Sequence, residues 1–106
     1  MEKATFGLDE NIAAALTYVL GFITGIIFIL MEKENKTVRF HAMQSTILFG
    51  GLFIVFLVVS FIPFVNMLLI LVWLVEIVLW LVLIIKAFQG EKFKVPVVGD
   101  MAESYV

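Results

Sequence analysis

Two long runs without a charged side chain constrain this sequence more than any other feature. Residues 11–31 and residues 42–75 contain no Asp, Glu, Lys or Arg, and after a single Glu76 the chain is apolar again as far as Ile85. A helix needs about 20 residues to cross the hydrocarbon core of a membrane. The first run therefore has the length of one membrane span, and the second run with its extension has the length of two.

The composition supports a membrane protein and excludes several other classes. Hydrophobic residues make up 63% of the chain and charged residues 15%, whereas soluble domains are about half apolar and about a quarter charged. A soluble domain this small could not hide so much apolar surface. The net charge of -2 argues against nucleic-acid binding, and the absence of cysteine argues against a disulfide or thiolate-zinc scaffold.

A turn divides the second run. Pro63 removes a backbone donor and disfavours helical geometry at the residue before it, and Asn66 can cap a following helix. We therefore expect an all-α, polytopic membrane protein with three transmembrane helices, the second and third forming a tight hairpin. The predicted spans are residues 10–31, 40–62 and 66–87.

One membrane domain covers residues 1–106 in this interpretation. Residues 88–106 are too short to span the bilayer, and they mix apolar side chains with Pro96 and Gly99. We expect this segment to lie at the cytoplasmic interface, where Phe93 and Tyr105 act as aromatic anchors.

The distribution of basic residues predicts the orientation of a multi-pass protein in the cell membrane. Cytoplasmic loops carry an excess of Lys and Arg. In a three-span arrangement Lys3 is the only basic residue on one side, and the other side holds Lys33, Lys36, Arg39, Lys86, Lys92 and Lys94. The sequence thus predicts the N-terminus outside, with the 32–41 loop and the C-terminus in the cytoplasm.

Glu76 is the sharpest candidate for a functional group. A carboxyl near the middle of a span is costly and points to a functional site by default. Trp73 and Trp80 share its helix face, and Thr24 is expected at the same depth on the first span. A protonated Glu76 that ties helices together, a proton or cation relay, and an oligomer contact all remain open.

Small residues suggest where helices approach closely. Gly21 and Gly25 have the G-x-x-x-G spacing of membrane helix contacts, and Gly50 and Gly51 are expected at a matching depth. Packing of the first span on the second is favoured over dimerisation, and a chance occurrence of these glycines is the alternative.

A polar motif begins the second predicted span. His41 lies three residues before Gln44 and four before Ser45, so the three share a helix face, and Arg39 precedes them. The motif could be an ordinary interfacial helix start with a snorkelling arginine. It could equally form a polar cytoplasmic mouth or a docking site for a partner.

Three segments together carry a family resemblance. They are Leu8–Leu16, the run Val38-Arg39-Phe40-His41-Ala42-x-Gln44-Ser45, and the tail from Lys86 to Asp100. With them the chain resembles a family of small uncharacterised integral membrane proteins from bacteria and archaea. That family is regarded as similar to Tic-twenty, a membrane component of the chloroplast protein-import machinery. The resemblance implies a possible relation to protein translocation, and it carries no established catalytic or binding residues.

The residues argue against an enzyme. The chain has one His, no Cys and no glycine-rich phosphate loop, so we expect no catalytic residues, no cofactor and no metal site. The favoured function is a structural, assembly or partner-binding helical bundle that contacts the lipid bilayer, other membrane proteins or a second copy. The alternative is a component of a protein-translocation or proton or ion transport assembly, with Glu76 as its working group.

Overall fold

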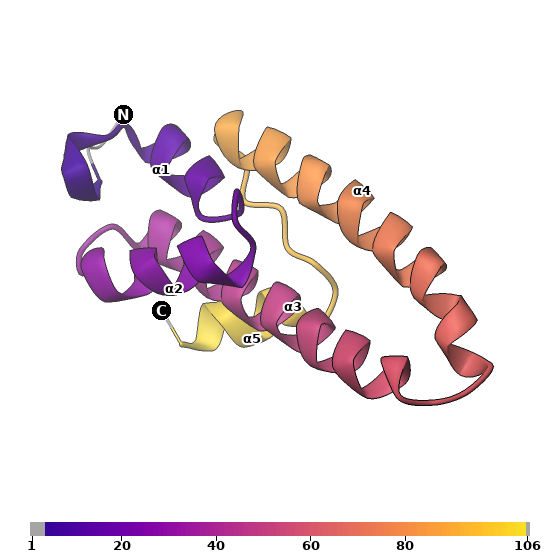
Figure 1. The fold of residues 1–106 in the computed structure, drawn as a ribbon. Helices are drawn as coiled ribbons and strands as arrows, with labels where there is room; N and C mark the ends of the chain where they lie inside the picture. The colour runs from indigo at the N-terminus through magenta and orange to yellow at the C-terminus, as the bar shows by residue number, and fades with distance from the viewer. Residues whose placement is uncertain (1–3, 106) are drawn as a thin grey trace.

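The computed structural model describes residues 4–105, and its regular elements are all helical (Figure 1). This confirms the expected all-α class. The elements are the 3-10 segment η1 (Thr5–Gly7), α1 (Glu10–Leu16), α2 (Phe22–Met31), α3 (Lys36–Ser60), the 3-10 segment η2 (Val65–Leu68), α4 (Leu69–Phe88) and α5 (Val98–Ser104). The molecule is elongated, with principal extents of 49 × 22 × 22 Å.

The helices α3 and α4 form the expected hairpin, and both are long and apolar enough to cross a membrane. The chain reverses just after α3, around Pro63 and Phe64, where Phe64 has a positive φ of 68°. The helix α3 begins at Lys36 rather than at residue 40, because the Asn35 side chain caps it by accepting a hydrogen bond from the Val38 N–H.

The first apolar run is not one continuous helix, as the sequence had suggested. It forms α1 and α2, separated by a turn over residues 17–21, and neither helix is long enough to cross a bilayer. Gly21 adopts φ 62° and ψ -133°, a conformation that side chains other than glycine disfavour. The Thr24 hydroxyl closes the turn by donating to the Thr17 carbonyl at 3.0 Å.

The start of α1 and the end of α2 both lie at the end of the α3–α4 hairpin opposite its turn. The Asn11 side-chain amide donates to the Phe88 carbonyl at 2.9 Å, so α1 begins where α4 ends. The helix α2 packs against α3 and ends beside Arg39, whose guanidinium donates to the Glu32 carbonyl at 2.6 Å. The start of α1 therefore lies at the same end of the molecule as the end of α4. The predicted continuous span over residues 10–31 would instead have placed these two points on opposite sides of a membrane.

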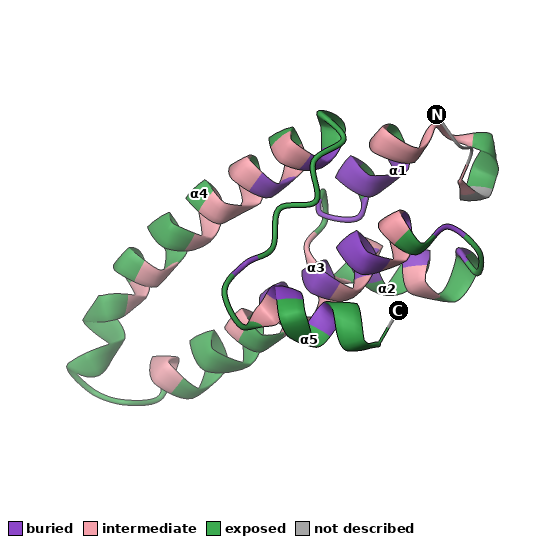
Figure 2. Cartoon of the chain, turned by 180° about the vertical axis from the view of Figure 1, so that it is seen from behind, coloured by how far each residue is buried: buried purple, intermediate pink, exposed green. Residues whose placement is uncertain are grey.

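Burial divides the molecule into two parts (Figure 2). We call residues 4–49 and 80–105 the inner half and residues 50–79 the outer half. Fully covered side chains such as Tyr18, Phe40 and Leu83 lie in the inner half. In the outer half no residue is buried.

The C-terminal segment, expected at the membrane interface, folds back onto α3. It runs extended from the end of α4, and α5 then packs against α3. Val95 and Ala102 are buried, and Gly99 lies so close to Lys94 that an added Cβ would stand 2.5 Å from the lysine Cβ.

Candidate functional site

Three polar side chains meet in the inner half. The Tyr18 hydroxyl lies 2.7 Å from His41 Nδ1, and its oxygen accepts a hydrogen bond from Gln44 Nε2 at 2.9 Å. Because the tyrosine oxygen accepts from Gln44, its own proton is available for Nδ1 in the histidine tautomer whose Nδ1 is the acceptor. All three side chains are almost completely buried, so this network is internal to the bundle.

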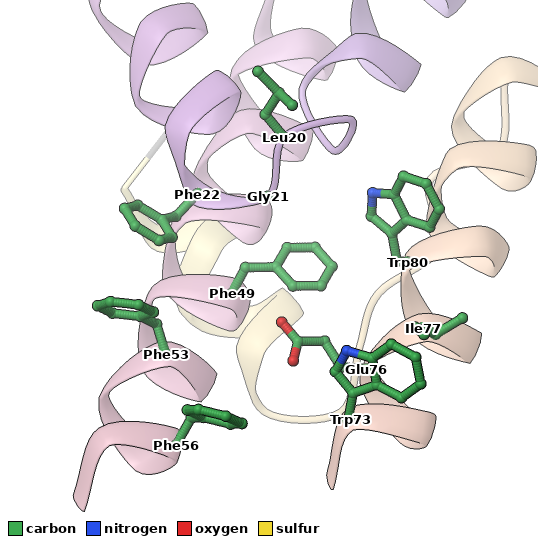
Figure 3. Close-up of a pocket in the computed structure, with 10 residues that line it drawn as sticks. All are labelled: Leu20, Gly21, Phe22, Phe49, Phe53, Phe56, Trp73, Glu76, Ile77 and Trp80. Atoms are coloured by element: carbon green, nitrogen blue, oxygen red, sulfur yellow. The ribbon is translucent and has the colours of Figure 1, made fainter. Parts of the chain in front are cut away.

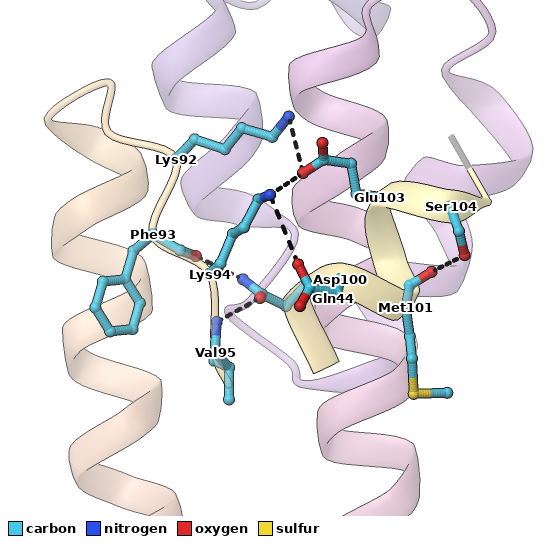
Figure 4. A network of polar contacts seen from close by, with 9 residues as sticks. All are labelled: Gln44, Lys92, Phe93, Lys94, Val95, Asp100, Met101, Glu103 and Ser104. Carbon is cyan, nitrogen blue, oxygen red and sulfur yellow. Dashed lines mark hydrogen bonds and ion pairs between the residues drawn. The ribbon is translucent and has the colours of Figure 1, made fainter. Parts of the chain in front are cut away.

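Gln44 also holds the C-terminal segment (Figure 4). Its Nε2 donates to the Phe93 carbonyl at 2.9 Å, and its Oε1 accepts from the Val95 N–H at 2.8 Å. A single amide thereby satisfies a backbone donor and a backbone acceptor, as a neighbouring strand would do. One side chain of α3 thus joins α1 and the chain that follows α4.

The remaining residues of the polar motif have structural roles as well. Arg39 Nη1 donates to the carbonyls of Ile29, at 3.1 Å, and Glu32, which lie at the C-terminal end of α2, where a cation is favourable. Ser45 Oγ donates to the Gly21 carbonyl at 2.9 Å, inside the turn. The four residues predicted as a cytoplasmic mouth or docking site are engaged within the chain and do not present an open polar surface.

The predicted small residues differ in what they contact. A Cβ added at Gly25 would lie 2.7 Å from Thr46 Oγ1 and 2.9 Å from the Ala42 carbonyl oxygen, so α2 and α3 are in close contact there. Gly21 faces Phe49, and Gly50 lies near Phe22 at ordinary van der Waals distance. A Cβ at Gly51 would meet nothing within 4 Å.

A groove of about 430 Å³ lies between α3 and α4, just beyond the turn between α1 and α2 (Figure 3). The two long helices splay apart toward the inner end, where α1 fills the space between them (Figure 1). Between α1 and the hairpin turn, the space between α3 and α4 stays open and forms the groove. Its lining residues are Leu20, Gly21, Phe22, Phe49, Phe53, Phe56, Trp73, Glu76, Ile77 and Trp80.

Glu76 is the acidic residue of this groove, and its carboxyl points from α4 toward α3 (Figure 3). Trp73 and Trp80 line the groove with it, as their shared helix face suggested. The Trp80 indole N–H is already used, because it donates to the Tyr18 carbonyl at 2.7 Å. Thr24 is not brought to Glu76, since its hydroxyl is bonded to the α1–α2 turn. Within residues 4–105 the Glu76 carboxyl has no hydrogen bond or ion pair.

The sequence interpretation missed two elements of these sites. Phe49, Phe53 and Phe56 follow one another at helical spacing of four and three residues, which was a usable signal for an aromatic face. Tyr18 was passed over because it lies in an apolar run that looked like a lipid-facing span. Its hydroxyl was the signal, since a buried tyrosine needs a hydrogen-bond partner.

Charged side chains fasten α5 at the inner end (Figure 4). Lys94 pairs with Glu103, and also lies 3.8 Å from Asp100. Hydrogen bonding to Glu103 raises the pKa of the Lys94 ammonium, and the same bond lowers the pKa of the Glu103 carboxyl. Lys92 Nζ lies 4.6 Å from the centre of the Phe40 ring, within cation–π distance.

These features define a small integral membrane protein built on a helical hairpin. The chain belongs to the family described as the magnetosome magnetite crystal formation protein family, whose model matches residues 8–102. A UPF0132 membrane protein of Methanocaldococcus jannaschii is 55% identical over 99% of this chain and 96% of its own length. A UPF0132 membrane protein of Archaeoglobus fulgidus is also 55% identical, over 93% of this chain and 97% of its own length. No solved structure matches the chain.

Proposed function

We infer that both ends of the described chain face the cytoplasm and that α1 and α2 form a re-entrant pair between them. Lys33, Lys36 and Arg39 lie at the end of the α3–α4 hairpin opposite its turn. Lys86, Lys92 and Lys94 lie at the same end, whereas the turn carries no charge. Basic residues favour the cytoplasmic side. The start of α1 shares that end through the bond between Asn11 and Phe88, so we replace the N-terminus-outside orientation by one with both ends inside.

We propose further that the protein binds a partner within the bilayer, in the groove between α3 and α4, and catalyses no reaction. The observation that carries this proposal is the Glu76 carboxyl, which stands without a partner in an aromatic groove at mid-hairpin depth. An unpaired carboxyl in hydrocarbon is costly. A molecule that occupies the groove and offers a hydrogen bond or a charge would offset this cost.

Transport is the second candidate, and the same residue favours it. A carboxyl in a groove that opens toward lipid can accept and release a proton or a cation during transport. Among the residues lining the groove, however, Glu76 has no second ionisable group beside it to receive the charge. The groove residues therefore suffice for binding, whereas transport would require a further ionisable group.

A role in protein translocation rests on the resemblance to Tic-twenty. Two long helices cannot enclose a path for a polypeptide, so such a role would need other subunits. The family description names magnetite crystal formation. No group of three or more His, Cys, Asp or Glu side chains in the described part of the chain is placed to hold a metal ion, and we do not extend that role to this protein.

Native mass spectrometry of the protein released from its own membranes tests the binding proposal. We expect a discrete small-molecule adduct that survives detergent removal. Ile77→Trp, which fills the groove, should abolish the adduct. Val78→Trp adds the same bulk at a neighbouring, exposed position outside the groove lining and should retain it. Identical adducts in both variants, with both equally folded by circular dichroism, would mean that only surrounding lipid is bound, and no adduct at all would contradict the proposal.

A further inference from the structure

The groove combines one carboxyl with many aromatic rings. Six of its ten lining residues are aromatic: Phe22, Phe49, Phe53, Phe56, Trp73 and Trp80. Three of the rings come from one face of α3, and the two indoles flank Glu76 along α4 (Figure 3). An ordinary lipid-facing surface needs neither this density of rings nor a carboxyl among them.

The described part of the chain supplies no positive charge to Glu76. All the basic residues in the described chain lie in the inner half, and none lines the groove. The Trp80 N–H and the Thr24 hydroxyl are bonded to backbone carbonyls of the α1–α2 turn and of the residues beside it. The Trp73 indole N–H also lines the groove and makes no hydrogen bond in the described structure. It is a neutral donor, so a positive charge opposite Glu76 must come from the ligand.

The faces of aromatic rings are electrostatically negative and attract cations, most strongly where water is excluded. When it is ionised, the Glu76 carboxyl adds a full negative charge in a medium that screens it little. A metal ion is a poor match, because a hard cation requires about six oxygen ligands and the groove side chains offer one carboxyl group. Organic cations, in contrast, are held by rings and a single counter-charge. A volume of about 430 Å³ is within the range of sites for small organic molecules.

We propose that the groove between α3 and α4 is a binding site for a lipophilic organic cation, with Glu76 as its counter-charge and the rings of α3 and α4 as its cage. This inference rests on the proposed function and names the chemical class of the ligand. Such a molecule has a delocalised or shielded positive charge surrounded by apolar groups, so it can partition into the bilayer and reach the groove laterally.

The test uses tetraphenylphosphonium as the probe, with purified full-length protein in detergent and equilibrium dialysis of the radiolabelled cation. We expect saturable binding of about one cation per chain. Glu76→Gln removes the charge with little change in shape and should weaken binding at least tenfold. Glu91→Gln is the matched control, because it removes a carboxylate that pairs with Lys86 outside the groove, and it should bind like the native chain.

Tetraphenylborate, an anion of nearly the same size and shape, distinguishes the proposed cation site from the more general proposal that the groove binds a partner. Binding of the cation that depends on Glu76, together with rejection of the borate, supports the cation site. If both probes bind equally and Glu76→Gln changes neither, while Ile77→Trp abolishes both, the groove binds partners but the cation class is wrong. If neither probe binds to well-folded protein, the proposal of a cation site is wrong. The proposed binding function is then decided by the presence or absence of the mass-spectrometric adduct.

Discussion

The inner and outer halves of this molecule satisfy their backbone hydrogen-bonding groups in different ways. Both consist of apolar helices, but the inner half satisfies its broken backbone with side chains such as Thr24, Gln44 and Trp80. The outer half has two uninterrupted helices whose side chains are all at least partly exposed. In a membrane, irregular backbone is tolerated only where protein or water satisfies it. The comparison teaches that the polar residues of this sequence support its irregular backbone rather than form an open polar surface.

The largest expected effect comes from the amide that joins three segments. Gln44→Leu leaves the Phe93 carbonyl and the Val95 N–H without their partner, and a buried unpaired backbone group costs about 1–3 kcal/mol. We expect a loss of about 3 kcal/mol in the free energy of unfolding and faster proteolysis around residue 95. Asn66→Leu, which also replaces an amide side chain by leucine but in the outer half, should have little effect on either measurement. Equal effects of the two changes would contradict the division into halves.

The second-largest expected effect comes from Gly25, where α2 and α3 are in close contact. Gly25→Ala places a methyl group 2.9 Å from the Ala42 carbonyl oxygen, and such overpacking costs about 1–3 kcal/mol. We expect a lower thermal unfolding temperature, measured by circular dichroism.

Gly51→Ala supplies the control for this change. The new methyl group meets nothing within 4 Å, and alanine favours a helix more than glycine does. The unfolding temperature should stay the same or rise slightly; a fall as large as that of Gly25→Ala would show that α3 has an unrecognised contact in the outer half.

A smaller effect distinguishes the two tryptophans. Trp80→Phe removes the indole N–H that donates to the Tyr18 carbonyl, and a hydrogen bond of this kind contributes about 1 kcal/mol. Trp73→Phe removes an indole with no hydrogen bond in the described structure. Denaturation in mixed micelles should therefore show the larger destabilisation for Trp80→Phe, and the reverse order would mean that Trp73 has a partner.

The smallest effect is the pH dependence of α5. Glu103 has a lowered pKa in the folded protein, so its contribution is present above the ordinary value of about 4.5 and is lost as the pH falls through the folded value. Lys94 has a raised pKa, so its contribution is present below about 10.5 and is lost as the pH rises through the folded value. Amide hydrogen exchange corrected for its intrinsic pH dependence should show α5 most protected between these limits. In Glu103→Gln the acid-side loss should disappear, and an unchanged profile would mean that packing alone holds α5.

The sequence was sufficient to predict the hairpin, because length, apolarity and the break at Pro63 all point to two spans there. It was not sufficient for residues 10–31. Hydropathy measures how apolar a run is, and two short helices joined by a turn are as apolar as one span. Gly21 was recognised as a small packing residue, but its role as the turn became visible only with its positive φ.

The candidate site was predictable to a similar degree. Glu76 and its two tryptophans were expected together, since one helix face depends only on spacing along the chain. Thr24 was assigned to Glu76 by counting depth along a continuous span, and the break in that span moves it elsewhere. The polar motif was read as surface because its partners, Tyr18 and the 93–95 backbone, are distant in sequence.

The turn at residues 61–64 has a consequence for how the chain enters the membrane. In the proposed orientation it is the part of the described chain that reaches the far side, and Phe61, Ile62, Pro63 and Phe64 carry no charge. Insertion would then require no charged residue to be carried completely across the hydrocarbon core, and Glu76 would travel only to mid-depth. The hairpin can enter as one unit from the cytoplasmic side, and α1 and α2 can fold against it afterwards without any further segment crossing the bilayer.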